Sequence, residues 1–280
     1  MTPNVRLALM LLALSGCALP GEVLLIVDTD APVVSVHGDS ALFDQLRIEL
    51  LRAGQPALMP LAQRDFEVTE EAFAAGRVSI GVYPLEGETE VSARVRLFRG
   101  AHLVAGEPPP QSTLDTTVRI PAVTDGTVTP IVVRLRVEDI GVAVGADQPI
   151  EPDVGALDRS RVGEWTGSVS SPCEGSAAPN EVCIFGGAFW MGNQDLVSID
   201  SARDANQIRL VALAPYYLDL TEVTVADFRA RYDEVNAGST TIDPYPRDAT
   251  QNPNNLKTWC TWQAAPGDTE SLPLNCIGRD

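Results

Sequence analysis

The sequence is poor in the residues that carry most protein chemistry. It contains only two histidines, His37 and His102, and 20 basic residues stand against 38 acidic ones. The resulting net charge of −18 repels phosphate groups, which excludes nucleic acid as a partner and argues against binding of anionic lipid headgroups through the protein surface. Two scattered histidines favour neither a zinc site nor the facial triad of a nonheme iron centre. We expect both histidines to be surface residues.

Several catalytic motifs are also missing. The sequence has no Gly-x-Ser-x-Gly elbow, no phosphate-binding loop, no dinucleotide-binding fingerprint and no Cys-x-x-Cys pair. Apolar residues nevertheless make up 45% of the 280-residue chain, which is enough to form a packed core in one large domain or two ordinary ones.

The N-terminus has the layout of a secretory signal peptide. Arg6 precedes an apolar run at residues 7–14, which is too short to span a bilayer, and Leu14-Ser15-Gly16-Cys17 resembles a lipobox. We therefore predict a lipoprotein signal peptide over residues 1–16 and cleavage before Cys17. An ordinary signal peptide with a chance cysteine is the alternative interpretation.

Lipidation of Cys17 would make the bilayer a partner of the chain through N-terminal acylation. The lipidated N-terminus is predicted to cover residues 17–21. By resemblance to known sorting rules, Ala18 favours the outer membrane over the inner one. The residues do not distinguish the periplasmic face from the cell surface.

The remaining four cysteines predict disulfide bonds. Their even number in an exported chain favours disulfides over free thiols, and four cysteines allow three pairings. Proximity favours two short loops, closed by Cys173 with Cys183 and by Cys260 with Cys276.

Residues 22–138 have the pattern of short strands. Apolar residues alternate with polar ones along several segments, which predicts half-buried strands, and Gly, Pro and Asp separate them. About six strands at this spacing predict an antiparallel β-sandwich. The expected strands include residues 23–27, 46–50, 78–83, 91–97, 117–123 and 131–137.

Three local features of this half have alternative interpretations. Residues 40–53 also fit a helical face, although we prefer a strand for their second half. Asp28-Thr29-Asp30 could contact a hard cation, but a strand-ending turn fits it better. The four arginines on two of the expected strands form a basic stripe that we predict to be a solvated outer face. These arginines are Arg94, Arg96, Arg134 and Arg136.

Residues 139–172 lose this periodicity. Gly, Pro, Asp and Ser are frequent there, which predicts a linker with one edge strand near Trp165.

After Cys183 a different motif begins. Residues 184–192 read Ile-Phe-Gly-Gly-Ala-Phe-Trp-Met-Gly. This stretch resembles the opening Pro-Gly-Gly-x-Phe-x-Met-Gly motif of the formylglycine-generating enzyme family, also called sulfatase-modifying factors, with Phe185 in place of the proline. The matching residues are Gly186, Gly187, Phe189, Met191 and Gly192. We expect the glycines to make turns and the alternating Phe189 and Met191 to point into a core.

Further motifs follow in the family's order. Residues 209–219 resemble its next strand, with the aromatic pair Tyr216 and Tyr217 before an acidic turn. Residues 220–228 resemble its Glu-Val-Thr-Asn-x-x-Phe signature, through Glu222, Val223, Thr224 and Phe228, with Val225 in place of the asparagine. Leu272-Pro-Leu-Asn275 resembles a Leu-Pro-Val segment of the family.

The second motif also has an explanation independent of the family. Thr224 fits a helix N-cap that Asp227 completes as a capping box, and Gly238 fits the helix end. We expect Glu222 to hold the turn through backbone hydrogen bonds. Tyr216, Tyr217 and Phe228 are expected core residues.

The resemblance covers residues 184–280 and implies a C-type-lectin-like α+β fold of low regular structure. It also implies that complete members oxidise a sulfatase cysteine to formylglycine, with oxygen and with copper held by two cysteines near the C-terminus of the family domain. We expect Cys260 and Cys276 to lie too early for that role and the calcium positions of the family to lie beyond Asp280. The chain is thus predicted to carry a partial domain over residues 173–280, without copper or calcium.

The functional prediction is a membrane-anchored surface lipoprotein that binds a protein or glycan ligand or acts as a scaffold, without catalysis. The alternative is the front fragment of a formylglycine-generating oxidoreductase whose catalytic cysteines lie beyond residue 280.

Overall fold

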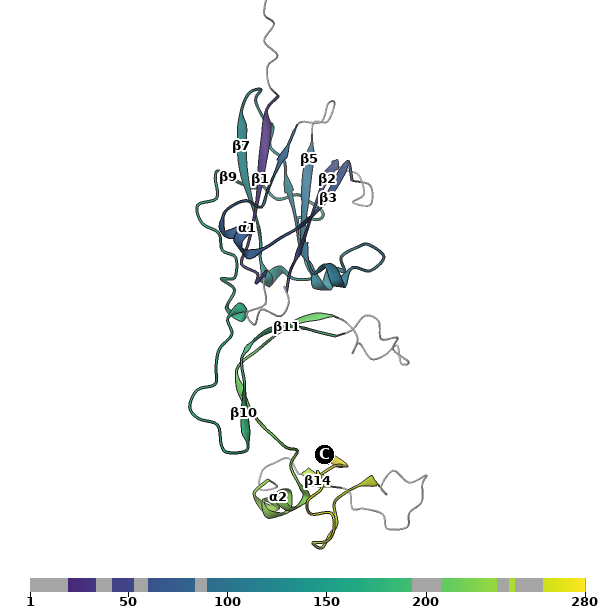
Figure 1. The fold of residues 1–280 in the computed structure, drawn as a ribbon. Coiled ribbons are helices and arrows are strands. Elements are labelled where there is room, and N and C mark those ends of the chain that lie inside the picture. Colours follow the sequence, from purple (N-terminus) through teal and green to yellow (C-terminus); the bar gives the residue numbers. More distant parts are fainter. Residues whose placement is uncertain are drawn as a thin grey trace, which may run out of the picture. The chain divides into compact units, whose positions relative to one another are not determined.

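A computed structural model describes most of the chain. The described residues are 20–33, 42–52, 60–83, 90–192, 208–235, 242–244 and 259–279. The predicted signal peptide and Cys17 lie outside these residues, as do His37 and Gly238. The fold is mostly β, as predicted (Figure 1).

By their contacts the residues form two compact units. The first unit contains residues 1–171 and 186–214, and the second contains residues 172–185 and 215–280. This division differs from the expected boundary at residue 173, because a hairpin of the family-like region packs within the first unit.

Two sheets build most of the first unit. The four-stranded sheet has the order β4 (Ser79–Val82), β1 (Glu22–Thr29), β7 (Val128–Leu135), β9 (Asp153–Val154). The five-stranded sheet has the order β3 (Ala62–Glu67), β2 (Gln45–Arg52), β5 (Val91–Phe98), β6 (Leu114–Arg119), β8 (Ala143–Val144). Short helices accompany them: α1 (Glu70–Ala74) and the 3-10 turns Gly100–His102, Pro110–Ser112, Val137–Asp139 and Thr166–Ser168.

The pairing within these sheets is mixed rather than antiparallel. β1 and β7 run parallel along their whole length, from Glu22 opposite Val128 to Thr29 opposite Leu135, and β6 also pairs with β8 in parallel. The prediction of purely antiparallel sheets is therefore wrong. Parallel strands need a long connection between them, and four strands of the five-stranded sheet, β2, β3, β5 and β6, lie in the chain between β1 and β7.

One apolar core joins both sheets. Alternate residues of β1 and β7, including Leu25, form a single buried cluster with alternate residues of β2 and β5 from the other sheet. For residues 40–53 the sequence allowed either a helix or a strand. The described part from Gln45 onward is the strand β2, and its apolar side chains Leu46 and Ile48 enter this core.

Residues 139–171 are part of the first unit rather than a free linker. They add β8 to one sheet and β9 to the other, and Trp165 donates its backbone N–H to the Asp30 carbonyl at 3.0 Å. The edge strands thus lie before Trp165, which is itself followed by a 3-10 turn. The expected linker was wrong because two-residue strands are too short to show a period.

A hairpin of β11 (Gly187–Met191) and β12 (Arg209–Leu213) completes the first unit. Trp190 donates its indole N–H to the carbonyl of Leu42 at 2.7 Å and packs edge-on against Phe43 and His102. His102 is therefore buried rather than at the surface, and burial lowers its pKa.

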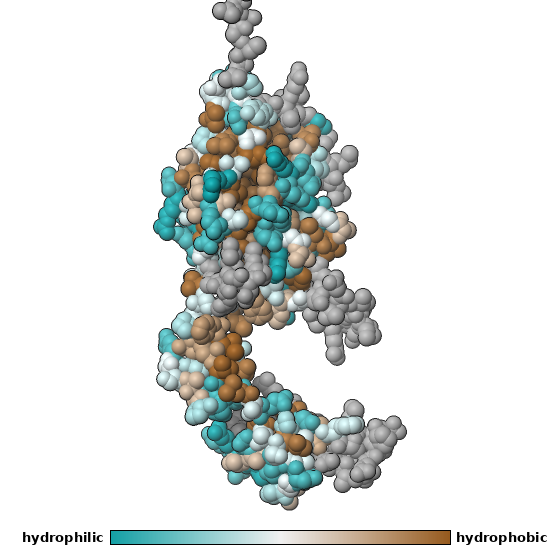
Figure 2. All heavy atoms as spheres, in the orientation of Figure 1, coloured by the Kyte–Doolittle hydropathy of each residue, from teal (hydrophilic) through white to brown (hydrophobic). Residues whose placement is uncertain are grey.

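The second unit is small and its sheets have two strands each. β10 (Glu181–Ile184) pairs with β13 (Tyr216–Asp219), and β14 (Ile242–Pro244) pairs with β15 (Ile277–Arg279). The described part of this unit also contains the helices α2 (Val225–Ala230) and α3 (Tyr232–Val235). Figure 2 shows apolar side chains at the surface around β10, which carries the 41%-exposed Val182.

An arginine organises the interior of the second unit. Arg229 on α2 pairs with Glu270 at 2.8 Å and lies 4.2 Å from the ring centre of Trp262. Trp262 stacks on Tyr232 and meets the edge of Phe228. The ion pair lowers the pKa of Glu270. Among the described residues of the chain, no helix is long and apolar enough to cross a bilayer.

Candidate functional site

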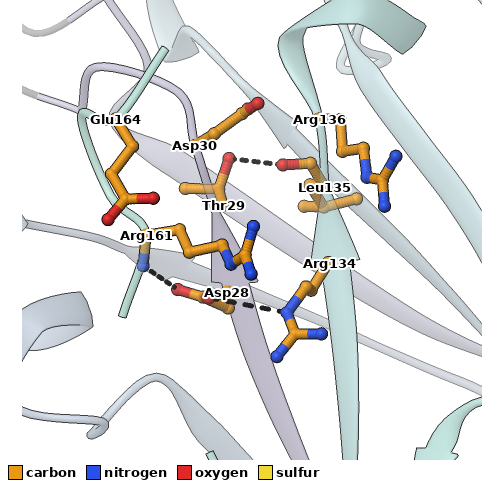
Figure 3. Close-up of a pocket in the computed structure, with 8 residues that line it drawn as sticks. All are labelled: Asp28, Thr29, Asp30, Arg134, Leu135, Arg136, Arg161 and Glu164. Atoms are coloured by element: carbon orange, nitrogen blue, oxygen red, sulfur yellow. Dashed lines mark hydrogen bonds and ion pairs between the residues drawn. The ribbon is translucent and has the colours of Figure 1, made fainter. Parts of the chain in front are cut away.

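A charged pocket lies where β1 and β7 end side by side. Because these strands are parallel and in register, Asp28 stands opposite Arg134 and Thr29 opposite Leu135. The pocket has a volume of about 280 Å³. Its charged lining consists of Asp28, Asp30, Glu164, Arg134, Arg136 and Arg161 (Figure 3).

Asp28 is the buried carboxylate of this pocket. It is fully buried, and its Oδ1 accepts hydrogen bonds from the Ser160 hydroxyl and from the backbone N–H of Arg161, both at 3.1 Å. Its Oδ2 lies 3.9 Å from Nε of Arg134, which is too long for a hydrogen bond. Neither of these two buried atoms has a hydrogen-bond partner among the described residues. The pocket therefore contains an acceptor and a donor that the fold leaves unused.

Thr29 and Asp30 turn the chain at the end of β1. The Thr29 hydroxyl donates to the Leu135 carbonyl at 2.7 Å and accepts from the Ala31 N–H. Asp30 accepts from the backbone N–H of Val137 at 2.9 Å. Burial raises the pKa of Asp30, and this hydrogen bond partly offsets the rise. These contacts agree with a strand-ending turn as the role of Asp28-Thr29-Asp30.

The three arginines of the pocket differ in how they are paired. Arg134 bonds to Asp153 at 2.9 Å, and Arg136 bonds to Glu138 at 3.0 Å. The exposed guanidinium of Arg161 has no ion-pair or hydrogen-bond partner within the described part of the chain. Ser160, Arg161 and Glu164 were missed because they lie in the segment expected to be a linker, and no local pattern places them next to β1.

The expected arginine stripe does not exist as one face. Arg94 and Arg96 lie on β5 in the five-stranded sheet, whereas Arg134 lies on β7 in the other sheet and Arg136 follows the end of β7. Arg96 is also buried rather than solvated, since it pairs with buried Glu49 at 2.8 Å. The alternation of apolar and polar residues correctly predicted which side chains point away from the core. It did not predict that the outer face of the five-stranded sheet is itself partly buried by ion-pair partners.

The face of the five-stranded sheet away from the core carries a network of ion pairs. Arg47 forms two 2.8 Å hydrogen bonds with Asp65, and Arg47 and Arg96 share Glu107 at 3.1 Å. Arg94 bonds to Asp115 at 2.9 Å. Burial raises the pKa of Glu49, although the nearby arginines lower it. The members of this network bind one another, which indicates a structural role.

Both expected cysteine pairs are confirmed as disulfide-bonded. The Cα atoms of Cys173 and Cys183 are 5.9 Å apart, and those of Cys260 and Cys276 are 5.4 Å apart. Both bonds lie in the second unit, one joining β10 to the chain that precedes it and the other closing a loop before β15.

In the motif at residues 184–192, the side chains that were expected in the core point toward solvent. Phe189 and Met191 are 41% and 38% exposed, while their neighbours Ala188 and Trp190 pack against the core of the first unit. The predicted core positions of Phe189 and Met191, and of 44%-exposed Tyr216, are therefore wrong.

The glycines of this motif have separate roles. Gly187 and Gly192 have φ angles of 150° and 116°, which side chains disfavour. Gly186 exchanges two backbone hydrogen bonds with Ser171.

The second motif begins α2 as predicted. Thr224 and Asp227 form a capping box, and Phe228 is buried. The chain at Val223 and Val225 pairs with the segment around Pro273, through bonds of 2.8 and 3.0 Å to Leu274 and Leu272. Glu222 is exposed, and its carboxylate accepts no hydrogen bond from a described backbone group, so the expected role of Glu222 in holding the turn is not seen.

Replacing Thr224 by alanine is expected to lower the unfolding free energy of the second unit by about 1 kcal/mol, because an N-cap bond is lost. Denaturant unfolding followed by tryptophan fluorescence measures the change. Val223→Ala, at the preceding 50%-exposed position, is the control and should cost less than about 0.5 kcal/mol. Equal losses in the two variants would contradict the capping role.

Comparison with known proteins gives no relative for this chain: no family model matches it, and neither does any curated protein or solved structure. Within the described residues, no three His, Cys, Asp or Glu side chains gather as metal ligands do. The pocket at the ends of β1 and β7 is lined by charged groups that can hold a polar ligand by ion pairs and hydrogen bonds.

Proposed function

We propose that the chain is an exported lipoprotein, anchored through Cys17, that binds a small polar ligand in the first unit. The observation that supports a binding role is the pocket at the ends of β1 and β7, where buried Asp28 Oδ2 and Arg134 Nε are left without hydrogen-bond partners among the described residues. Native proteins rarely leave such groups unmatched, because burying them without a partner costs free energy. In this proposal the first unit is a β-sandwich and the second belongs to a C-type-lectin-like domain.

The predicted cellular location agrees with the disulfides. Cys173–Cys183 and Cys260–Cys276 are expected to persist where the environment is oxidising, as in the periplasm or at a cell surface. A diacylglycerol on Cys17 supplies two acyl chains, and two are needed for stable anchoring. The proposed outer-membrane destination rests on Ala18 alone.

Replacing Cys17 by serine is expected to abolish acylation and to release the protein from membranes. The measurement is incorporation of labelled palmitate in a bacterial host, together with fractionation. Ser15→Ala is the control, because it keeps a small residue at the cleavage site and should leave labelling unchanged. Palmitate found on the Cys17→Ser protein, or none on the unchanged protein, would overturn the anchor.

A second candidate is the formylglycine-generating activity. It is supported by the motifs at residues 184–192 and 220–228, which occur in the family's order. Incubation with a sulfatase-derived cysteine peptide, copper and oxygen tests it, and we expect no aldehyde, since Cys260 and Cys276 are bonded to each other. Aldehyde formation would establish the second candidate.

A further inference from the structure

The pocket at the ends of β1 and β7 contains one carboxylate oxygen and two arginine side chains that can each bind a ligand group of the opposite charge. Asp28 Oδ2 is a carboxylate oxygen with no donor within hydrogen-bond distance among the described residues. The guanidinium of Arg161 and Nε of Arg134 are donors without an acceptor there. In Figure 3 both guanidinium groups lie beside Asp28. A cationic group would satisfy the carboxylate, and an anionic group would satisfy the arginines.

The charge balance of the lining disfavours a simple ion. Three carboxylates and three guanidinium groups surround the cavity. A free phosphate would pair only with the guanidinium groups, and a simple amine would pair only with the carboxylates. Either ion would leave the pocket with an unbalanced charge. A ligand that carries one charge of each sign keeps the balance, and it forms charge-assisted hydrogen bonds, which are about twice as strong as the bonds of a neutral hydroxyl.

We infer that this pocket binds a small zwitterion, an amino acid or dipeptide, with its ammonium group on Asp28 and its carboxylate on Arg161 and Arg134. A cavity of about 280 Å³ suits a molecule of this size. The side chain of Arg161 is exposed and can move to admit the ammonium group. The inference rests on the proposed binding function but not on the lipid anchor.

The other polar residues around the pocket do not compete with the ligand for Asp28 or Arg161, because they have partners of their own. Asp30 is held by the Val137 N–H, and Glu164 pairs with Arg159. Ser160 holds Asp28 Oδ1 and thereby directs Oδ2 away from the backbone of the 160–162 segment. Ser160 is therefore a positioning residue for the ligand contact.

Calorimetry on the full-length protein in detergent tests the inference. The probes are the proteinogenic L-amino acids and glycylglycine, compared with propylamine, propionate, glucose and inorganic phosphate. At least one zwitterion should bind with a Kd below about 1 mM, and propylamine and propionate should bind at least about tenfold more weakly, since each lacks one charge-assisted contact.

Variants then locate the site. Arg161→Gln should weaken zwitterion binding by about tenfold or more without a change in thermal stability, because its guanidinium is exposed. Arg119→Gln is the control outside the pocket, since exposed Arg119 pairs with Glu151 and neither residue lines the cavity, and this variant should bind as the unchanged protein does. Asp28→Asn should abolish binding, and circular dichroism checks that it folds.

The outcomes separate the two proposals. If no zwitterion binds, or if Arg161→Gln binds it unchanged, the inference is overturned. Binding of glucose or phosphate that Arg161→Gln abolishes would overturn the zwitterion but leave the binding function in place. The anchor is tested separately by palmitate labelling.

Discussion

Replacing Trp190 by alanine is expected to lower the unfolding free energy of the first unit by about 3 kcal/mol. The indole packs edge-on against Phe43 and bonds to the Leu42 carbonyl, so the change leaves a cavity and an unpaired carbonyl. Thermal and urea unfolding, followed by circular dichroism, measure the loss.

The strand that carries Trp190 supplies the control. Phe189 is the adjacent residue on the opposite face of β11 and is 41% exposed, so Phe189→Ala should cost less than about 1 kcal/mol. A larger loss for Phe189→Ala than for Trp190→Ala would show that the hairpin faces the other way, as the motif alone predicts.

Replacing Arg96 by methionine is expected to destabilise the protein by about 3 kcal/mol at pH 7. The change removes the 2.8 Å partner of buried Glu49 and leaves an uncompensated charge. Arg136→Met is the control, since Arg136 and Glu138 form an exposed pair that should contribute less than about 1 kcal/mol.

The cost of Arg96→Met should depend on pH. Burial already raises the pKa of Glu49 above its ordinary value of 4.5, and removal of Arg96 raises it further, because Arg96 lowers it. A carboxyl with a raised folded-state pKa gives its full stability below the unfolded pKa and loses it as pH rises through the folded pKa. The loss should therefore shrink toward pH 4, and adding Glu49→Gln should remove this dependence. A loss that is constant with pH would contradict it.

Local pattern was sufficient for most strands of the first unit. Alternation along β2, β5 and β7 identified the residues that enter the core, because side chains on opposite faces of a strand differ in exposure. The disulfides could also be predicted, since both bonds close short loops.

The inner face of β11 and the position of the pocket depend on contacts between residues far apart in the sequence, and the local pattern does not reveal them. In β11 both faces are apolar, and only the contact of Trp190 with Leu42, far away in the sequence, selects the inner face. The pocket depends on Asp28 lying beside Arg134, which follows from a parallel pairing between strands more than 100 residues apart. Arg161 reaches the same place through an irregular segment that has no period to read.

The place of β1 in its sheet has a mechanical consequence. It begins at Glu22, a few residues after the cysteine proposed to carry lipid, and hydrogen bonds tie it on one side to β4 and on the other to β7. A force applied through the membrane attachment would act along the axis of β1. The hydrogen bonds of β1 to β4 and β7 would then be loaded in shear, all at the same time, instead of breaking one after another. The arrangement suits a protein that must stay folded under tension.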